Sequence, residues 1–131
     1  MADEMKKLRV GCYGAKGSYT YEAMERQFGE REREEHYYPL FEDVLKAVSE
    51  GVIDYGVVPI ENSSTGGITE VYDLIMKHRM FIVGAADIPV RHCLCRAKGT
   101  GAVKKVLSKH EALVQCSAYL AAHDIETEAY S

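Results

Sequence analysis

Three short segments combine glycine, hydroxyl and amide residues in patterns that suit the binding of a small anion. The first is Gly14-Ala-Lys-Gly17-Ser18-Tyr19-Thr20, in which two glycines precede a hydroxyl-rich helix start. Glycine lets a ligand approach the backbone closely, and the free N–H groups at a helix start attract negative charge. The segment does not match the G-x-x-x-x-G-K-[ST] pattern of a nucleotide-binding loop. A tight turn followed by a helix cap is the alternative interpretation.

The second segment is Val58-Pro59-Ile60-Glu61-Asn62-Ser63-Ser64-Thr65-Gly66-Gly67. An apolar strand runs into proline, which ends strand pairing and fixes the exit direction of the chain. A carboxyl group, an amide and three hydroxyls then precede the next helix. A plain loop requires fewer functional groups, although capping and turn formation would explain some of them.

The third segment runs from Ser108 to Cys116. Ser108 is a suitable N-cap and Glu111 follows three residues later, so a capping box explains both without any function. Gln115 is harder to explain in this way, because it lies two turns into the expected helix.

The elements that would position these segments alternate between strand and helix. Apolar runs and helical periodicity predict strands over 8–13, 36–40, 55–60, 81–86, 90–96, 103–107 and 126–130, and helices over 18–28, 42–49, 68–77 and 110–123. The charged run over 30–35 has mixed signs and predicts a solvated connection. This alternation predicts an α/β fold with mostly parallel sheets.

Ligands of open α/β sheets bind beyond the carboxyl ends of the strands, against helix N-termini. The three segments fall at such junctions in the predicted order of elements. Together they predict a cleft that is rich in helix N-termini and neutral hydrogen-bond donors. That chemistry suits a small dicarboxylate and does not suit a large apolar cofactor.

Composition excludes several other classes. The 131 residues include 16 basic and 20 acidic side chains, a balance that does not indicate a nucleic-acid partner. No apolar run reaches the ~20 residues that span a membrane. The charged start, without the apolar stretch of a signal peptide, leads us to expect a cytoplasmic protein.

The four cysteines, Cys12, Cys93, Cys95 and Cys116, lie in apolar segments without the spacing of a disulfide framework. We expect buried, reduced thiols. His92, Cys93 and Cys95 lack a second ligand pair at zinc-site spacing, so no metal is expected.

The same segments resemble the prephenate dehydratase family. Gly14-x-x-Gly17-Ser18-Tyr19-Thr20-x-x-Ala23 is similar to its opening G-x-x-G-[ST]-[FY]-[ST]-x-x-A, and Val58 to Ser63 with the following glycines matches V-P-I-E-N-S-x-x-G. His92-Cys93-Leu94 matches its H-C-L strand, and Ser108 to Cys116 is similar to S-H-P-x-A-L-x-Q-C. The resemblance covers nearly the whole chain in the right order, and the E-N-S segment is its most specific part.

The resemblance implies two α/β lobes around a cleft, as in type II periplasmic binding proteins, with residues 1–84 in the first lobe and 85–131 in an incomplete second lobe. It implies the decarboxylating dehydration of prephenate to phenylpyruvate in L-phenylalanine biosynthesis, without metal or cofactor. The residues implied as catalytic are Glu61, Asn62, Ser108 and Gln115. Those implied to bind substrate are Gly17, Ser18, Tyr19, Thr20, Ser63, Ser64 and Gly66.

The chain also departs from the family pattern. Lys109-His110-Glu111 replaces H-P-Q, and the later S-T-A-x-A-A and T-R-F motifs do not occur before Ser131. We therefore expect little turnover from this chain alone. A binding lobe without activity and an arogenate dehydratase are the alternatives. Because unpaired sheet edges favour association, we also expect a homo-oligomer, with exchange of elements as one route.

Overall fold

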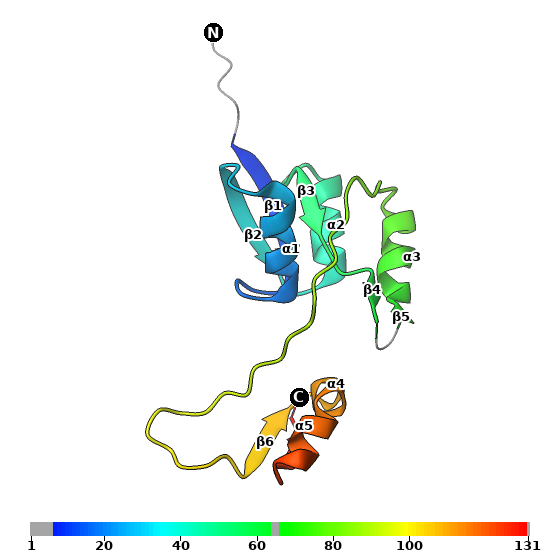
Figure 1. Ribbon diagram of the computed structural model, residues 1–131. Helices are drawn as coiled ribbons and strands as arrows, with labels where there is room; N and C mark the ends of the chain where they lie inside the picture. The colour runs from blue at the N-terminus through cyan, green and yellow to red at the C-terminus, as the bar shows by residue number, and fades with distance from the viewer. Residues whose placement is uncertain (1–6, 64–65, 131) are drawn as a thin grey trace. The chain divides into compact units, whose positions relative to one another are not determined.

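Figure 1 shows a computed structural model of the chain, which describes residues 7–63 and 66–130. The chain forms two compact units, Met1–Pro89 and Val90–Ser131, and each is described by itself. The boundary predicted after residue 84 stays a prediction. Within the described residues, no helix is long and apolar enough to cross a bilayer.

The first unit alternates strands and helices. Its elements are β1 (Leu8–Tyr13), α1 (Tyr19–Phe28), β2 (Arg33–Tyr38), α2 (Phe41–Ser49), β3 (Tyr55–Val57), β4 (Glu61–Asn62), β5 (Gly66–Gly67) and α3 (Thr69–Lys77). The predicted first strand and the first three predicted helices are confirmed to within a residue at each end.

A parallel sheet in the order β2-β1-β3 forms the centre of this unit. β1 pairs with β2 from Leu8↔Arg33 to Tyr13↔Tyr38, and with β3 as far as Cys12↔Val57. The predicted α/β class with mostly parallel pairing is confirmed.

β1 is buried on both faces because a helix packs on each. Alternate residues of a strand point to opposite sides. On one side lies a cluster of Leu8, Val10, Cys12 and Met24, of which the last belongs to α1. On the other side a Cβ at Gly11 would collide with Ile53, which packs with Val44 of α2. The apolar run that predicted this strand is therefore that of a buried parallel strand.

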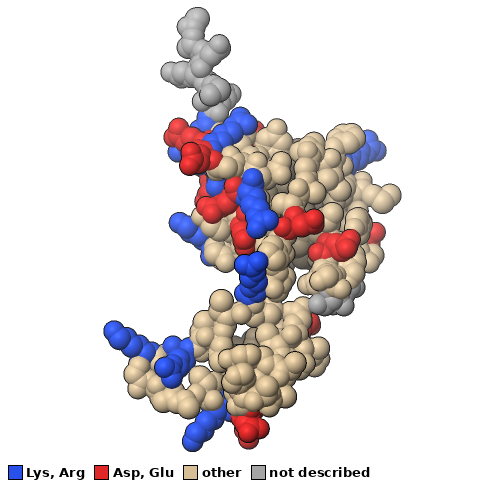
Figure 2. All heavy atoms as spheres, viewed as in Figure 1, with Lys and Arg blue, Asp and Glu red and all other residues tan. Residues whose placement is uncertain are grey.

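β2 begins earlier than predicted and forms the edge of the sheet. The Arg33 side chain is only 9% exposed, and its Nε lies 3.0 Å from Glu35 Oε2. Its Nη1 also donates to the Gly29 carbonyl oxygen at 2.8 Å. The prediction that residues 30–35 are only a solvated connection was thus wrong for 33–35, because neighbouring acceptors satisfy the guanidinium. Figure 2 shows the intermixed charges on this unit, and a charged edge strand resists pairing with another chain.

α3 is fastened to α2 by charged side chains. Lys77 Nζ donates to Glu42 Oε1 at 2.7 Å, and His78 Nε2 lies 3.3 Å from the same oxygen. Val71 and Leu74 form the buried face of α3. α3 is thus held in the unit by apolar packing and by polar contacts with α2.

Residues 80–97 have no regular secondary structure, so the strands predicted over 81–86 and 90–96 were wrong. A strand needs a neighbouring backbone, and no described residue pairs with this segment in a sheet. Within the first unit, α1 holds the start of the segment: Arg26 Nη1 donates to the Asp87 carbonyl oxygen at 2.9 Å. Phe81 is nevertheless 89% exposed.

The second unit contains β6 (Lys105–Ser108), α4 (His110–Gln115), α5 (Ser117–Ala122) and β7 (Glu126–Ala129). β6 and β7 pair in parallel, from Lys105↔Glu126 to Ser108↔Ala129. The single helix predicted over 110–123 was wrong. At Cys116 the backbone leaves the helical region (φ −101°, ψ 7°), and the two short helices each contact β7.

The cysteines differ in exposure. Cys12 is buried and Cys116 is half-buried, whereas Cys93 and Cys95 are exposed. The expectation of buried thiols was therefore wrong for the C-x-C pair, because the irregular segment that carries it is not covered by described residues. Among those residues, no group of three or more histidine, cysteine or acidic side chains is placed to hold a metal ion.

Candidate functional site

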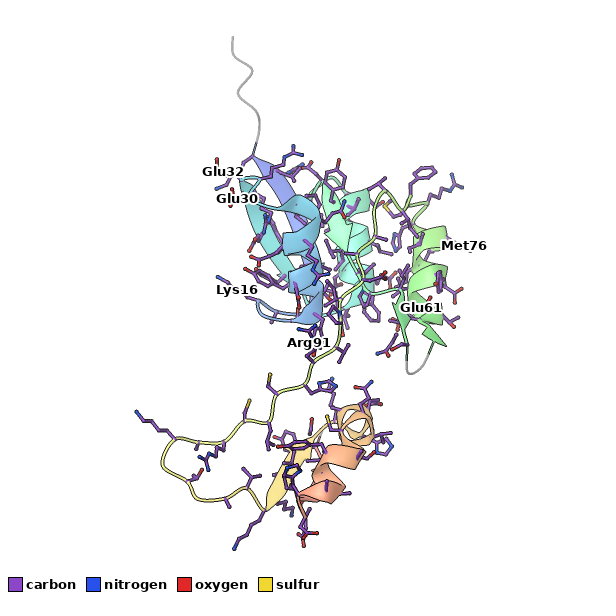
Figure 3. All side chains as sticks on the ribbon, in the orientation of Figure 1. Lys16, Glu30, Glu32, Glu61, Met76 and Arg91 are labelled. Carbon is purple, nitrogen blue, oxygen red and sulfur yellow. The ribbon has the colours of Figure 1, made fainter. Side chains whose placement is uncertain are left out.

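The predicted site residues of the first unit follow the carboxyl ends of two adjacent strands. β1 and β3 are parallel neighbours, so their carboxyl ends lie at one edge of the sheet. The segment Gly14–Ser18 follows β1, and Val58–Ile60 follows β3. In Figure 3, Lys16 and Glu61 lie at this lower edge, whereas Glu30 and Glu32 lie at the opposite edge. The topology thus brings the first two predicted segments to the same edge.

The first segment is a turn that ends in a capped helix. Gly14 and Gly17 have φ values of 90° and 91°, a left-handed conformation that other residues rarely adopt. Ser18 Oγ accepts a hydrogen bond from the Tyr21 N–H at 3.2 Å. Ser18 is therefore the N-cap of α1, as predicted, and Tyr19 and Thr20 form the first turn of that helix.

The first turn of α1 also presents side chains at its surface. Tyr19 is 38% exposed, and Thr20 is half-buried. The first turn of a helix carries the positive end of the helix dipole, which attracts an anion. The geometry suits the predicted binding role, which stays a prediction.

The second segment is a hairpin, where the sequence predicted a loop. β4 and β5 pair in antiparallel fashion, with Glu61 opposite Gly67 and Asn62 opposite Gly66. The Ile68 N–H also donates to the Ile60 carbonyl oxygen at 2.9 Å. A loop was predicted because two-residue strands leave no periodicity to detect.

The hairpin fixes the backbone of the predicted catalytic pair. Glu61 is exposed and Asn62 is half-buried. Ser63 is exposed, and Ser64 lies outside the described residues. A Cβ at Gly67 would stand 3.0 Å from Tyr72 Cε2, so the hairpin packs on α3. Backbone pairing and helix packing thus hold the E-N-S segment in place.

The third segment lies in the second unit and is built differently from its prediction. Ser108 ends β6, and its carbonyl oxygen accepts from the Tyr130 N–H at 2.8 Å. The N-cap of α4 is Lys109, without a side-chain cap. The predicted capping box was therefore wrong, because Ser108 belongs to the parallel pairing with β7. Gln115 is the last residue of α4, and its Oε1 lies 2.6 Å from His92 Nε2.

Lys16 and His92 are two further candidate site residues. Lys16 lies between the two left-handed glycines and forms no ion pair with a described residue. Its position in a glycine turn ahead of a helix was visible in the sequence. His92 contacts Gln115, and the H-C-L match was the signal for it.

None of the predicted residues lines either of two grooves in the second unit. A groove of about 430 Å³ in the second unit is bordered by α4, α5 and β7, and Ser108 and Gln115 are not among its lining residues. Eight of the predicted residues that the structure describes fall in the first unit, namely Gly17, Ser18, Tyr19, Thr20, Glu61, Asn62, Ser63 and Gly66. Ser108 and Gln115 fall in the second.

The fold and these segments define a class: α/β domains that carry polar glycine-rich junctions at the carboxyl edge of a parallel sheet. The sequence model of the family Prephenate dehydratase matches residues 10–131. The chain therefore belongs to the prephenate dehydratase family.

Curated relatives support the same assignment. Arogenate dehydratase 2 of Petunia hybrida is 38% identical over 120 residues, which cover 88% of this chain and 29% of that protein. The bifunctional chorismate mutase/prephenate dehydratase of Escherichia coli (strain K12) is 38% identical over 117 residues, 86% of this chain and 30% of that protein. An arogenate dehydratase/prephenate dehydratase of Arabidopsis thaliana is 36% identical over 115 residues, 84% of this chain and 29% of that protein. The chain thus spans less than a third of the length of these relatives.

Proposed function

We propose that this chain forms part of an enzyme that converts prephenate to phenylpyruvate, CO2 and water in L-phenylalanine biosynthesis. The observation that carries the proposal is the parallel pairing of β1 with β3, since it brings the G-x-x-G-S-Y-T and E-N-S segments to one edge of the sheet. The membership of the family supports the same reaction. We further propose the two-lobed arrangement of type II periplasmic binding proteins for the intact domain.

The chemistry places modest demands on the protein. The ring carboxylate leaves as CO2, its bonding electrons complete the aromatic ring, and the C4 hydroxyl leaves as water after gaining one proton. Aromatisation supplies the driving force, so the protein has to orient a dianion and to protonate the leaving hydroxyl. Neutral donors and helix N–H groups stabilise the carboxylates.

We assign the roles by residue type and position. Asn62 and Ser63, after β3, would donate hydrogen bonds to substrate, as would Ser108 and Gln115 in the second unit. Glu61 would take part in proton transfer or orient a donor. Gly17 to Thr20, together with Ser64 and Gly66, would bind a substrate carboxylate. Lys16 adds a positive charge to the first of these segments.

Arogenate is the second candidate substrate, because two of the relatives are named as arogenate dehydratases. It carries an amino group in place of the side-chain keto group and loses the same hydroxyl and carboxylate. The third possibility is a chain that binds either substrate without turnover, as expected when the T-R-F motif does not occur before Ser131.

The test is to assay the complete gene product, and this chain alone, with prephenate and with arogenate. Phenylpyruvate or phenylalanine formation identifies the substrate. In the active form, Asn62→Ala should lower kcat/KM by about 10- to 100-fold, the effect of losing one hydrogen bond to a charged group. Glu30→Gln, at the opposite edge of the sheet, is the control and should leave the kinetics unchanged. Absence of turnover with both substrates, or wild-type kinetics for Asn62→Ala, would contradict the proposal.

A further inference from the structure

His92 and Gln115 form a short contact within the second unit. His92 Nε2 lies 2.6 Å from Gln115 Oε1, although 23 residues separate them in sequence. His92 belongs to the irregular segment before β6, and Gln115 ends α4. The contact therefore joins a residue without an assigned role to one of the predicted catalytic residues.

The chemistry of the two groups fixes the direction of this hydrogen bond. The amide oxygen of glutamine is only an acceptor, so His92 Nε2 must carry the hydrogen. The Gln115 amide is planar, so its NH2 group lies on the side opposite the oxygen that contacts His92 Nε2. Two N–H donors are thus directed away from the imidazole.

We infer that His92 is a positioning residue that orients the Gln115 amide so that its NH2 group, and not its oxygen, faces a substrate carboxylate. The inference rests on the proposed function. A glutamine amide can turn by half a rotation at little cost in water, and its oxygen would repel a dianion. The His92 N–H beside the Gln115 amide oxygen holds the amide in one of its two orientations before substrate binds.

The geometry also lowers the entropic cost of binding. A glutamine side chain loses rotamer freedom when it is ordered on binding. Gln115 lies at the surface. The His92 contact orders it in advance, which is how preorganised donors gain their effect.

The first test needs no turnover. Long-range ¹H–¹⁵N correlation spectra of this chain at about pH 8 report which ring nitrogen carries the hydrogen. We expect the Nε2–H tautomer for His92. The Nδ1–H tautomer would overturn the inference, because Nε2 would then have no hydrogen to donate. Gln115→Glu keeps an acceptor for His92 and should keep this tautomer.

The second test is a double-mutant cycle in the complete gene product. His92→Leu should lower kcat/KM by about 2- to 13-fold, the range of one neutral hydrogen bond. In a Gln115→Ala background the same change should have no further effect, since His92 acts through Gln115. His92→Gln retains an N–H donor of similar reach and should restore most of the loss. Gln115→Glu should lose turnover while keeping the His92 contact.

The control is His123→Leu, which removes another exposed histidine of the same unit and its hydrogen bond to the Tyr119 carbonyl oxygen. It should leave kcat/KM unchanged. If His92→Leu still lowers activity when Gln115 is alanine, His92 acts directly and the inference is wrong. If neither substrate is converted, the proposed function fails and the substrate-directed role with it, while the tautomer still decides whether the contact exists.

Discussion

Gly56 of β3 and Val44 of α2 are so close that a Cβ added at position 56 would lie 2.6 Å from Val44 Cγ1. Val44 is completely buried, so its side chain has no free space into which to move. The helix that covers this face of the sheet therefore packs directly on the backbone of β3.

We predict that Gly56→Ala lowers the free energy of unfolding by about 1–3 kcal/mol, the usual cost of inserting a methyl group into a packed core. Urea denaturation followed by circular dichroism measures it. Gly101→Ala is the matched control, because nothing lies within 4 Å of a Cβ at that position. Equal stability of the two variants would contradict the packing described here.

The link between α2 and α3 should respond to acid. The pKa of Glu42 lies below its ordinary value of 4.5, first because Lys77 donates a hydrogen bond to it and then because His78 does. A carboxyl group with a lowered folded pKa stabilises the folded state above its ordinary pKa, and this contribution is lost as pH falls through the folded pKa. Glu42→Gln should therefore reduce stability at neutral pH, with a deficit that shrinks below pH 4.5.

Urea midpoints at pH 7, 5, 4 and 3 measure this deficit. Glu70→Gln, which removes an acid on α3 for which no ion pair is seen among the described residues, is the control. A deficit for Glu42→Gln that stays constant down to pH 3 would be inconsistent with the ion pair.

The cysteines should differ in reactivity. Burial raises the pKa of the Cys12 thiol to about 11, so almost no thiolate forms at neutral pH. In the native chain at pH 8, iodoacetamide should modify Cys93 and Cys95, which are exposed, well before Cys12. Peptide mass spectrometry gives the order, and modification in urea should remove the difference. Early labelling of Cys12 would show that the core of the first unit opens readily.

The irregular segment should drive self-association of this chain. Phe81 and Val83 are 89% and 75% exposed, and their backbone has no sheet partner among the described residues. Light scattering should give a mass above the 14.6 kDa of one chain. Phe81→Lys should lower that mass, whereas Met76→Lys, at a position on α3 that is 78% exposed, should not. A monomer at all concentrations would refute the prediction.

Patterns that depend on local packing could be read from the sequence. The two-sided apolar run of β1 and the Ser18 cap gave correct bounds, because the residues concerned meet their partners within a few positions or within one sheet. The edge strand β2 was placed too late, because Arg33 looks solvated until Glu35 and the Gly29 carbonyl are brought beside it.

Features that depend on distant partners were not predictable in the same way. The strands predicted after Met80 had the right composition, but composition does not supply a neighbouring backbone. For the site, the residue types at the junctions were informative, whereas the β4–β5 hairpin and the His92–Gln115 contact are formed only in the folded chain. Ser108 is the clearest example. The sequence has the pattern of a capping box there, but the Ser108 carbonyl oxygen accepts a hydrogen bond from the Tyr130 N–H of the parallel pairing.

The central place of β1 has a consequence for synthesis of the chain. β1 leaves the ribosome before both strands that flank it, and β3 completes the sheet only at Val57. Until then the nascent polypeptide carries a strand that is hydrophobic on two sides and has no lasting neighbour. Translation speed between the codons for β1 and those for β3, and the chaperones that meet the emerging chain there, should therefore influence how much protein reaches its native state.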